Sequence, residues 1–332
     1  MSNWVSSTWP LVYSVLLVVV QIDLVSIALG FSRWRAVIFL QSITPLLLPV
    51  ATAIAIAATF TGHFVVSGLA LVQVIWILVL FARSLRQQRR DAPVQGVVLR
   101  LAHANVLHSN ATPERAVADV LATDADIIAF TEITDSIHRH AERHAVAERW
   151  PHRVHDLRDG PRGIALWSKV PLASATIEPL HDCHAVIAVI EGEVRLQVLA
   201  VHPMAPVSAQ KTRDWAPSLR SIGRILIDSP LPTVAIGDYN ATHWHPPLRS
   251  LYRQGVHSAH LRVGRILSAT FPVGRRLRPF VLLDHALVTD DIEVHDLSHL
   301  EVAGSDHRGI VVDLSVRSTS THDLSGDDQS GR

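Results

Sequence analysis

The chain has 332 residues, 48% of them hydrophobic and 18% charged, and its formal net charge is zero. These averages conceal two unlike halves, because residues 1–82 carry only three acidic or basic side chains, Asp23, Arg33 and Arg35. The sequence therefore predicts a membrane region followed by a soluble domain of ordinary size, and the zero net charge describes neither part. The single cysteine, Cys183, excludes an intramolecular disulfide.

Three apolar runs occupy the membrane region, at residues 11–31, 36–60 and 64–82. A helix needs about 20 residues to cross the hydrocarbon of a bilayer, so each run predicts one transmembrane helix. Pro45 and Pro49 predict a kink in the second helix, which a helix bundle tolerates. Asp23 lies inside the first run, where a carboxylate is either functional or hydrogen-bonded between helices. We favour the second interpretation, because the other spans hold no basic residue that would complete an ion path.

Basic residues flank these runs on one side only. They lie in the first connection and after the third run: Arg33, Arg35, Arg83, Arg86, Arg89 and Arg90. Because basic residues near the spans favour the cytoplasm, this pattern predicts a multi-pass cell-membrane protein with an outer N-terminus and a cytoplasmic soluble domain. A role in handling cell-wall lipid carriers would favour the outer face instead, and one miscounted helix would reverse the orientation.

Residues 83–95 are predicted to be a basic linker, residues 96–316 the soluble domain, and residues 317–332 a disordered tail. Within the domain, the apolar patterns predict strands at 95–105, 126–130, 163–168, 185–190, 194–201, 281–288, 292–300 and 310–316, and a further strand before Gly237. Helices are predicted at 113–121, 133–149, 210–228 and 247–254. Many strands alternating with few helices predict an α/β fold of two packed sheets flanked by helices.

The stretch 231–240 is central to the functional prediction. An apolar run at 234–236 stops at Gly237 and is followed by Asp238 and Asn240. On a continuing strand these two side chains would point to the same face. An ordinary turn is the alternative, because Gly-Asp-x-Asn is also a common turn sequence.

Polar residues recur at the ends of the other predicted strands. The set is Asn105, Glu132, His202, Asp238, Asn240, Asp284, Asp306 and His307. Each member alone has a structural interpretation, as a cap, a turn or a loop residue. Together they provide carboxylates that bind Mg²⁺, and amides and imidazoles that stabilise charge on phosphoryl oxygens.

With these motifs the sequence resembles the endonuclease/exonuclease/phosphatase superfamily, which has the deoxyribonuclease I-like fold, over about residues 96–316. The resemblance implies a four-layer sandwich of two mixed β-sheets flanked by helices, with the site at one edge of the sheets. It implies Mg²⁺, with Mn²⁺ as a possible substitute, held mainly by Glu132 and assisted by Asn105 and Asp306. Thr131 stands where Gln is common before the glutamate, and Tyr239 stands where Phe is common.

The resemblance also implies the catalytic set. His202 matches the histidine on the phosphate side, and Asp238 with Asn240 matches the pair that positions the nucleophilic water and binds phosphate. Asp284 matches the aspartate that orients the final histidine, His307. A closer resemblance is to a membrane subgroup similar to VanJ-type glycopeptide-resistance proteins, carried by residues 240–251 and Ala269-Thr-Phe-Pro272.

These observations predict a membrane-anchored, Mg²⁺-dependent phosphohydrolase that cleaves phosphate or pyrophosphate esters of a membrane lipid or a lipid-linked substrate. The expected partners are the lipid bilayer and a phosphorylated substrate. The alternative is a membrane-tethered endo- or exonuclease, for which Arg262, Arg265, Arg275, Arg276 and Arg278 would supply basic surface. A catalytically silent membrane scaffold is a third interpretation, disfavoured by the intact set. The sequence gives no indication of the oligomeric state.

Overall fold

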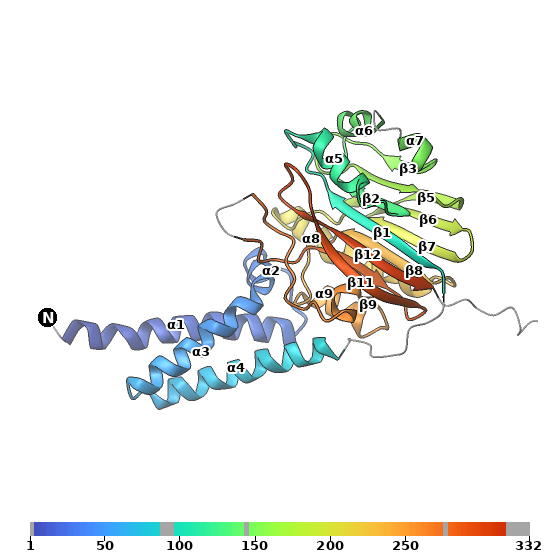
Figure 1. Cartoon of the computed structure of the whole chain (residues 1–332). Coiled ribbons are helices and arrows are strands. Elements are labelled where there is room, and N and C mark those ends of the chain that lie inside the picture. The colour runs from blue at the N-terminus through green and yellow to red at the C-terminus, as the bar shows by residue number, and fades with distance from the viewer. Residues whose placement is uncertain (1–2, 87–95, 143–145, 275–277, 317–332) are drawn as a thin grey trace, which may run out of the picture.

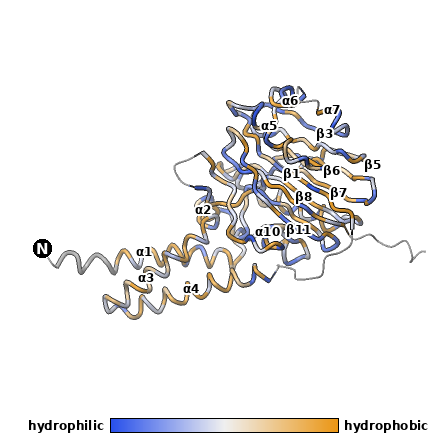
Figure 2. The backbone as a smooth tube through the Cα atoms, viewed as in Figure 1, coloured by the Kyte–Doolittle hydropathy of each residue, from blue (hydrophilic) through white to orange (hydrophobic). Residues whose placement is uncertain are grey.

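The computed structural model describes residues 3–86, 96–142, 146–274 and 278–316. Three long helices lie side by side and extend from a sandwich of two β-sheets (Figure 1). The long helices are hydrophobic along nearly their whole length, whereas the sandwich alternates hydrophobic and hydrophilic segments (Figure 2). Most of the predicted linker, residues 87–95, and the predicted tail, residues 317–332, lie outside the described residues.

The membrane region forms four helices: α1 (Asn3–Ala28), α2 (Arg35–Ser42), α3 (Thr44–Phe60) and α4 (Phe64–Leu85). Of the described helices, α1 and α4 are each long and apolar enough to cross a membrane. The predicted second span is broken, because α2 and α3 meet at an angle of 77° and count as a third span only as a pair. Pro45 lies in the first turn of α3, where a proline is tolerated but cannot continue the preceding helix. Pro49 lies inside α3, which continues through it.

Asp23 is buried among the long helices. The Thr44 hydroxyl donates a hydrogen bond of 2.9 Å to Asp23 Oδ2, which joins α1 to α3. Gln73 of α4 donates through Nε2 to the Leu17 carbonyl of α1 at 2.9 Å. The contact between Asp23 and Thr44 agrees with the interpretation of Asp23 as a group hydrogen-bonded between helices.

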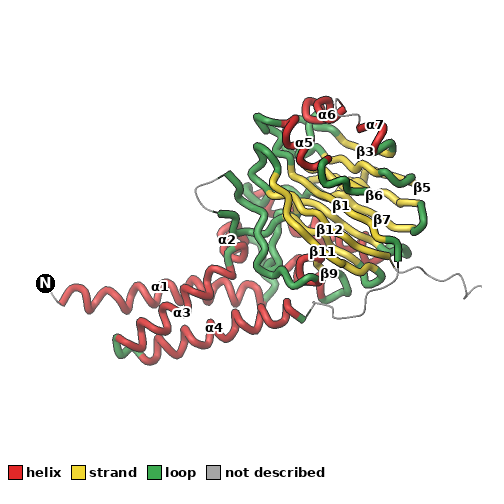
Figure 3. The backbone as a smooth tube through the Cα atoms, viewed as in Figure 1, coloured by secondary structure: helices red, strands yellow, loops and turns green. Residues whose placement is uncertain are grey.

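The sandwich contains two six-stranded mixed sheets (Figure 3). The first has the order β11-β12-β1-β2-β4-β3, with β1 (Val98–Asn105), β2 (Ile127–Thr131), β3 (His152–Asp156), β4 (Ile164–Ser168), β11 (Ile292–Glu301) and β12 (Arg308–Val316). The second has the order β5-β6-β7-β8-β10-β9, with β5 (Leu172–Leu180), β6 (Cys183–Glu191), β7 (Arg195–Val201), β8 (Thr233–Asp238), β9 (His257–Ser258) and β10 (Asp284–Val288). Leucine, isoleucine and valine side chains from the facing sides of both sheets form the central core.

Helices cover the two outer faces. The first sheet is covered by α5 (Pro113–Leu121), α6 (Asp135–Glu142) and α7 (Val146–Arg149), which pack against Phe130 and Trp167. The second sheet is covered by α8 (Ala209–Asp228) and α9 (Pro246–Tyr252), and a short helix, α10 (Ala259–Arg262), follows β9. The four-layer α/β sandwich predicted from the sequence is therefore confirmed.

Three edge strands were not predicted, namely β3, β5 and β9, the last of which has only two residues. Strand β5 is exposed at nearly every position, so it lacks the apolar alternation from which a strand is recognised. Strand β3 is half-buried and contains two histidines, an arginine and an aspartate among its five residues. The helix predicted at 133–149 begins two residues later than predicted, at Asp135, and is described as α6 and α7 on either side of residues 143–145, which lie outside the described residues.

Helix α2 packs against the sandwich as well as against the other membrane helices. Its Ile38 side chain is buried in the core under α8 and α9. His245 donates from Nε2 to the Ile38 carbonyl at 2.9 Å, and Arg35 donates to the Val207 carbonyl at 2.8 Å. The bend before α3 therefore lies at the junction of the membrane helices and the sandwich.

Candidate active site

The predicted site residues gather at one edge of the sandwich, where strands of both sheets end. Strands β1 and β2 are parallel, and Asn105 pairs with Thr131 at their carboxyl ends. In the second sheet β7 and β8 are parallel, and β10 runs antiparallel to β8 so that Asp284 lies directly opposite Asp238. The amino end of β12 lies beside the carboxyl end of β1, which brings His307 to the same edge.

The stretch around Gly237 differs in detail from the prediction. Strand β8 does not stop at Gly237 but includes Asp238, and a Cβ at Gly237 would lie 1.9 Å from the Val201 carbonyl oxygen of β7. The glycine is required for this close approach of two strands. Asn240 has a left-handed backbone with φ of 48°, so the strand has ended before it and the two polar residues do not share a strand face. Its backbone N–H donates to Asp238 Oδ1 at 2.8 Å, and its side chain donates to the Pro203 carbonyl at 3.0 Å.

Asp238 is almost fully buried and is the most connected carboxylate of the site. Asn105 donates from Nδ2 to Asp238 Oδ2 at 3.1 Å, and the Nε2 atoms of His202 and His307 lie 3.5 and 3.7 Å from the same oxygen. Burial alone would raise the pKa of Asp238, but the charge of His307 and the hydrogen bond from His202 outweigh it and lower that pKa. Asp238 is therefore an ionised acceptor at neutral pH.

His307 lies between two buried carboxylates. Its Nδ1 donates to Asp284 Oδ2 at 2.9 Å, while its Nε2 faces Asp238. Burial would lower the pKa of His307, but the negative charges of Asp284 and Asp238 raise it to about 10. The imidazole is therefore a cation at neutral pH. The pKa of Asp284 is raised, because burial outweighs the favourable charge of His307.

Glu132 occupies the end of β2 in an unusual conformation. Its backbone φ is 59°, a left-handed value that costs a glutamate energy and is found mainly where the surrounding structure imposes it. Asn105 donates from Nδ2 to Glu132 Oε1 at 3.1 Å, so one amide bridges Glu132 and Asp238. His108 contacts Glu132 Oε2 through both its ring Nδ1 and its backbone N–H. We call Glu132, Asp238, Asp284 and His307 the acidic site.

Several carboxylate and amide oxygens lie close together in the site, and oxygen ligands of this kind fit a hard divalent cation. Among the described residues, one group of three ionisable side chains has ligand atoms within 4.8 Å of one another, namely Asp238, Asp284 and His307. A protonated imidazole cannot bind a metal, however, so His307 is not suited to be a ligand. Glu132 and Asn105 fit a metal ion better. Asp306 is half-buried beside His307, and its negative charge adds to the rise of the His307 pKa. The structure thus links seven of the eight predicted residues by direct contacts and places Asp306 next to them in the chain.

Sequence reasoning missed several residues that support the site. His103 on β1 is fully buried, with Nδ1 3.4 Å from Asp284 Oδ1 and Nε2 3.2 Å from the Thr131 hydroxyl. Burial lowers the pKa of His103 to about 3, so this ring is neutral. Two further supports come from the loop before β10: the Thr270 hydroxyl accepts from the backbone N–H of Asp284 at 3.3 Å, and the Phe271 ring lies 4.9 Å from the ring of His307. The sequence signal for His103 was its position two residues before Asn105, on the same side of a strand.

A second group of buried histidines lies on the other side of β10. The ring of His285 is 5.0 Å from that of His243 and 5.8 Å from that of His260, and we call these three residues the histidine cluster. Burial lowers the pKa of each ring, to about 4 for His285. The Nε2 of His285 donates to the Ala241 carbonyl at 2.7 Å, which fixes the loop after β8.

The family model for the endonuclease/exonuclease/phosphatase family matches residues 102–307, which is more than half of the chain and spans the whole acidic site. The chain belongs to this family. No curated protein matches its sequence.

Similar solved structures share the fold at low sequence identity. The crystal structure of D. rerio TDP2 complexed with a single-strand DNA product is 14% identical, with a TM-score of 0.56 over 66% of this chain and 99% of that chain. A family member from Beutenbergia cavernae is 18% identical, with a TM-score of 0.52 over 66% of this chain and 72% of that one. The 3′ phosphatase NExo from Neisseria, bound to a product DNA hairpin, is 15% identical, with a TM-score of 0.52 over 64% and 98% of the two chains.

Proposed function

We propose that the protein is a membrane-anchored, divalent-metal-dependent phosphohydrolase acting on a phosphate or pyrophosphate ester of a membrane lipid. Family membership supports hydrolysis of phosphoester bonds. The observation that carries the lipid substrate is the attachment of helix α2 to the loop that follows β8. His245 of that loop donates to the Ile38 carbonyl of α2, five residues after Asn240. This contact holds the acidic site beside apolar helices that are long enough to cross a bilayer.

The side chains suggest a division of labour. Asp238 orients the attacking water and accepts its proton late in the reaction, because a carboxylate with a lowered pKa is a weak base. His307 is already protonated, so it stabilises negative charge on the phosphoryl group and does not act as a base. His202 and Asn240 border Asp238 and would contact the phosphate oxygens. Asp284 orients His307 through the bond to Nδ1.

Glu132, Asn105 and Asp306 would hold the metal, for which Mg²⁺ is proposed and Mn²⁺ is a substitute. The bound ion would supply charge neutralisation at the phosphoryl oxygens. Asn105 joins this set to Asp238 through its amide, so the metal ligands and the water-orienting residue belong to one connected group.

A nuclease is the second candidate, because two of the similar structures are named as complexes with DNA products. Of the five arginines considered for a basic surface, Arg278 is exposed, as this function would need, but Arg262 is not. Arg262 is buried and lies 3.4 Å from Asp290, so it does not face a nucleic acid. Arg265 is exposed and 3.8 Å from Asp296. Arg275 and Arg276 lie outside the described residues.

The test compares two substrates on the full-length protein in nanodiscs at equal Mg²⁺. We expect kcat/KM for release of phosphate from a polyprenyl pyrophosphate to exceed that for cleavage of plasmid DNA. The physical reason is tethering, which raises the effective concentration of lipid head groups at the site without any new contact. Efficient DNA cleavage without release of phosphate from the lipid would overturn the proposal in favour of the nuclease.

The proposed location of the sandwich is the cytoplasmic face. Arg35 lies at the end of the helix bundle that touches the sandwich, and Arg83 lies in the last turn of α4. Such basic residues favour the cytoplasmic side. Protease treatment of intact cells tests this placement, and loss of the sandwich from intact cells would place it outside.

A further inference from the structure

We propose that a pocket at the junction of the membrane helices and the sandwich binds the hydrocarbon of the substrate, next to the phosphate. This inference rests on the proposed function and deepens it. It names the substrate class as a lipid phosphate or pyrophosphate whose first segment beyond the phosphate is an apolar chain, not a sugar or a nucleoside. We call this the junction pocket.

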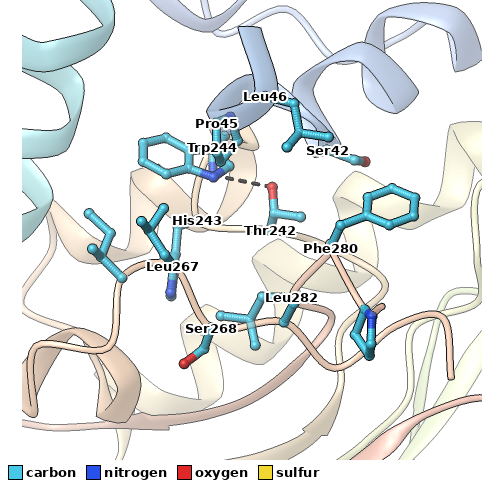
Figure 4. Close-up of a pocket in the computed structure, with 13 residues that line it drawn as sticks. Ser42, Pro45, Leu46, Thr242, His243, Trp244, Leu267, Ser268, Phe280 and Leu282 are labelled. Atoms are coloured by element: carbon cyan, nitrogen blue, oxygen red, sulfur yellow. Dashed lines mark hydrogen bonds between the residues drawn. The ribbon is translucent and has the colours of Figure 1, made fainter. Parts of the chain in front are cut away.

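The walls of the junction pocket come from both parts of the molecule. The bend between α2 and α3 provides Ser42, Pro45 and Leu46, and the loops of the sandwich face it from the other side (Figure 4). Those loops contribute Thr242, His243, Trp244, Leu267, Ser268, Phe280 and Leu282. The cavity volume is about 290 Å³, and most of its lining side chains are apolar.

The loops that line the junction pocket are the same loops that hold the acidic site. Thr242 follows Asn240 by two residues, and Leu282 precedes Asp284 by two residues. Ala269 lies in the wall and is followed by Thr270, whose hydroxyl accepts from the Asp284 backbone. A phosphate at the acidic site and a chain in the pocket are therefore bound by neighbouring residues of the same loops.

The rim of the junction pocket suits contact with a bilayer. In the described part of the sandwich, six large hydrophobic residues are exposed, and two of them, Leu267 and Phe280, lie at this pocket. Leu46 on α3 is 45% exposed at the same place. Exposed apolar groups gathered on one side of a domain indicate contact with a membrane or a partner. Here α3, whose apolar sequence belongs to the broken span, provides the opposite wall, so lipid is the occupant that the surroundings favour.

The pocket size limits how much of the ligand it takes. Its volume is at the lower end for sites that enclose a small molecule. It therefore accommodates only the first part of a long chain, and the remainder would extend past Leu46 into the bilayer. Trp244 forms a firm wall, because its ring lies 4.7 Å from that of Phe81 on α4 and its side chain is buried.

The test uses two pyrophosphates that share the same reacting group, farnesyl and methyl pyrophosphate, on the full chain in nanodiscs. Leu46→Trp would fill the pocket, and Ile56→Trp is the matched control, because Ile56 is also exposed on α3 but does not line the pocket. We expect Leu46→Trp to lower kcat/KM for the farnesyl compound about tenfold, the effect of displacing about two methylene groups. The methyl compound, which has no chain to enter the pocket, and the control variant should change less than about twofold.

A binding measurement separates failure of the pocket from failure of the proposed function. Farnesyl thiopyrophosphate binding is measured by calorimetry for the wild type, Leu46→Trp and Ile56→Trp, with Leu267→Trp as a second pocket-filling variant on an exposed loop. Weaker binding in both pocket variants alone supports the pocket even if no lipid is hydrolysed. Equal affinity in all four proteins, or equal loss of activity on both pyrophosphates, overturns the pocket and leaves the proposed function standing if the wild type hydrolyses them.

Discussion

The acidic site and the histidine cluster are two buried groups of titratable side chains on opposite sides of one strand. Asp284 and His285 are consecutive on β10, so one side chain enters the acidic site and the other enters the cluster. Burial disfavours a charged imidazole in both places. In the acidic site two carboxylates outweigh burial and raise the pKa of His307 to about 10, whereas in the cluster burial dominates and the pKa of His285 falls to about 4. The balance between burial and neighbouring carboxylates decides the charge of a buried histidine: two carboxylates outweigh burial at His307, whereas burial prevails at His285 and also at His103, although Asp284 lies 3.4 Å from the His103 ring.

The largest expected effect comes from removing the proposed cation or its main ligand, because the acidic site holds several carboxylates close together. We expect Glu132→Ala to abolish hydrolysis, and millimolar Mg²⁺ should not restore it fully. Excess EDTA should abolish activity of the wild type, and added Mg²⁺ should restore it. Glu178→Ala on the exposed strand β5 is the control and should retain full activity. Wild-type activity that survives EDTA would exclude the metal-dependent mechanism.

The next largest effect is expected from changes to Asp284 and His307, and a double variant tests whether these two residues act as one unit. We expect Asp284→Asn and His307→Ala each to lower kcat roughly 10³- to 10⁴-fold, because each change removes the oriented cation that faces Asp238. The double variant should lose little more than either single variant, since residues that act together are not additive. Steady-state kinetics of the three variants measures this. Losses that multiply in the double variant would show that the two residues act independently.

The acidic site was predictable from the sequence because each of its residues lies at or next to a strand terminus in a recognisable motif. The motifs that contain Glu132, Asp238 and His307 indicate the same family resemblance that predicts the four-layer fold. The roles of these residues remain predictions. Other features have no local signal: the 77° bend before α3 depends on how α2 packs against the sandwich, through Ile38 and His245. Strand β5 is held by pairing with β6 and not by its own pattern.

The supporting role of His103 could not be predicted from the sequence, for a different reason. Its sequence neighbours do not distinguish a core histidine from a supporting residue of the site. Its position becomes clear only when β1 and β10 are brought together across the two sheets, which places its Nδ1 at 3.4 Å from Asp284 Oδ1. The substitution of Thr131 for the common Gln of the family then has a consequence, because the Thr131 hydroxyl contacts the other nitrogen of the same ring.

A smaller effect is expected when this neutral histidine is changed. His103 is a positioning residue that borders Asp284, and groups of this kind typically contribute a 10- to 100-fold effect, so we expect roughly tenfold lower kcat for His103→Asn with KM unchanged. His103→Gln, with a longer amide, should recover part of the loss. The control is His260→Asn, an equally buried histidine of the cluster, which should leave kcat unchanged. A rise in KM without a fall in kcat would contradict the positioning role.

The smallest effect concerns stability between pH 7.5 and pH 5.5, the range in which a histidine of ordinary pKa titrates. The cluster histidines have folded pKa values below their unfolded value of about 6.5, so the unfolded chain binds more protons in acid. Their stabilising contribution is complete above pH 6.5 and is lost as the pH falls toward the folded pKa. At pH 5.5 the loss is about 1.4 kcal/mol for each fully buried ring.

The contribution of His307 to stability changes with pH in the opposite direction to that of the cluster histidines. Its folded pKa is raised, so its contribution is complete below pH 6.5 and is lost only as the pH rises through about 10. The three cluster histidines and His103, all with lowered pKa values, outnumber it, and we therefore expect the midpoint of thermal unfolding, measured in detergent with EDTA, to fall by several degrees from pH 7.5 to pH 5.5. His260→Gln should reduce this acid sensitivity, whereas His307→Gln should leave it intact or slightly larger. A midpoint that stays constant in the wild type would mean that the cluster is charged in the folded protein, and the contrast between the two sides of β10 would be lost.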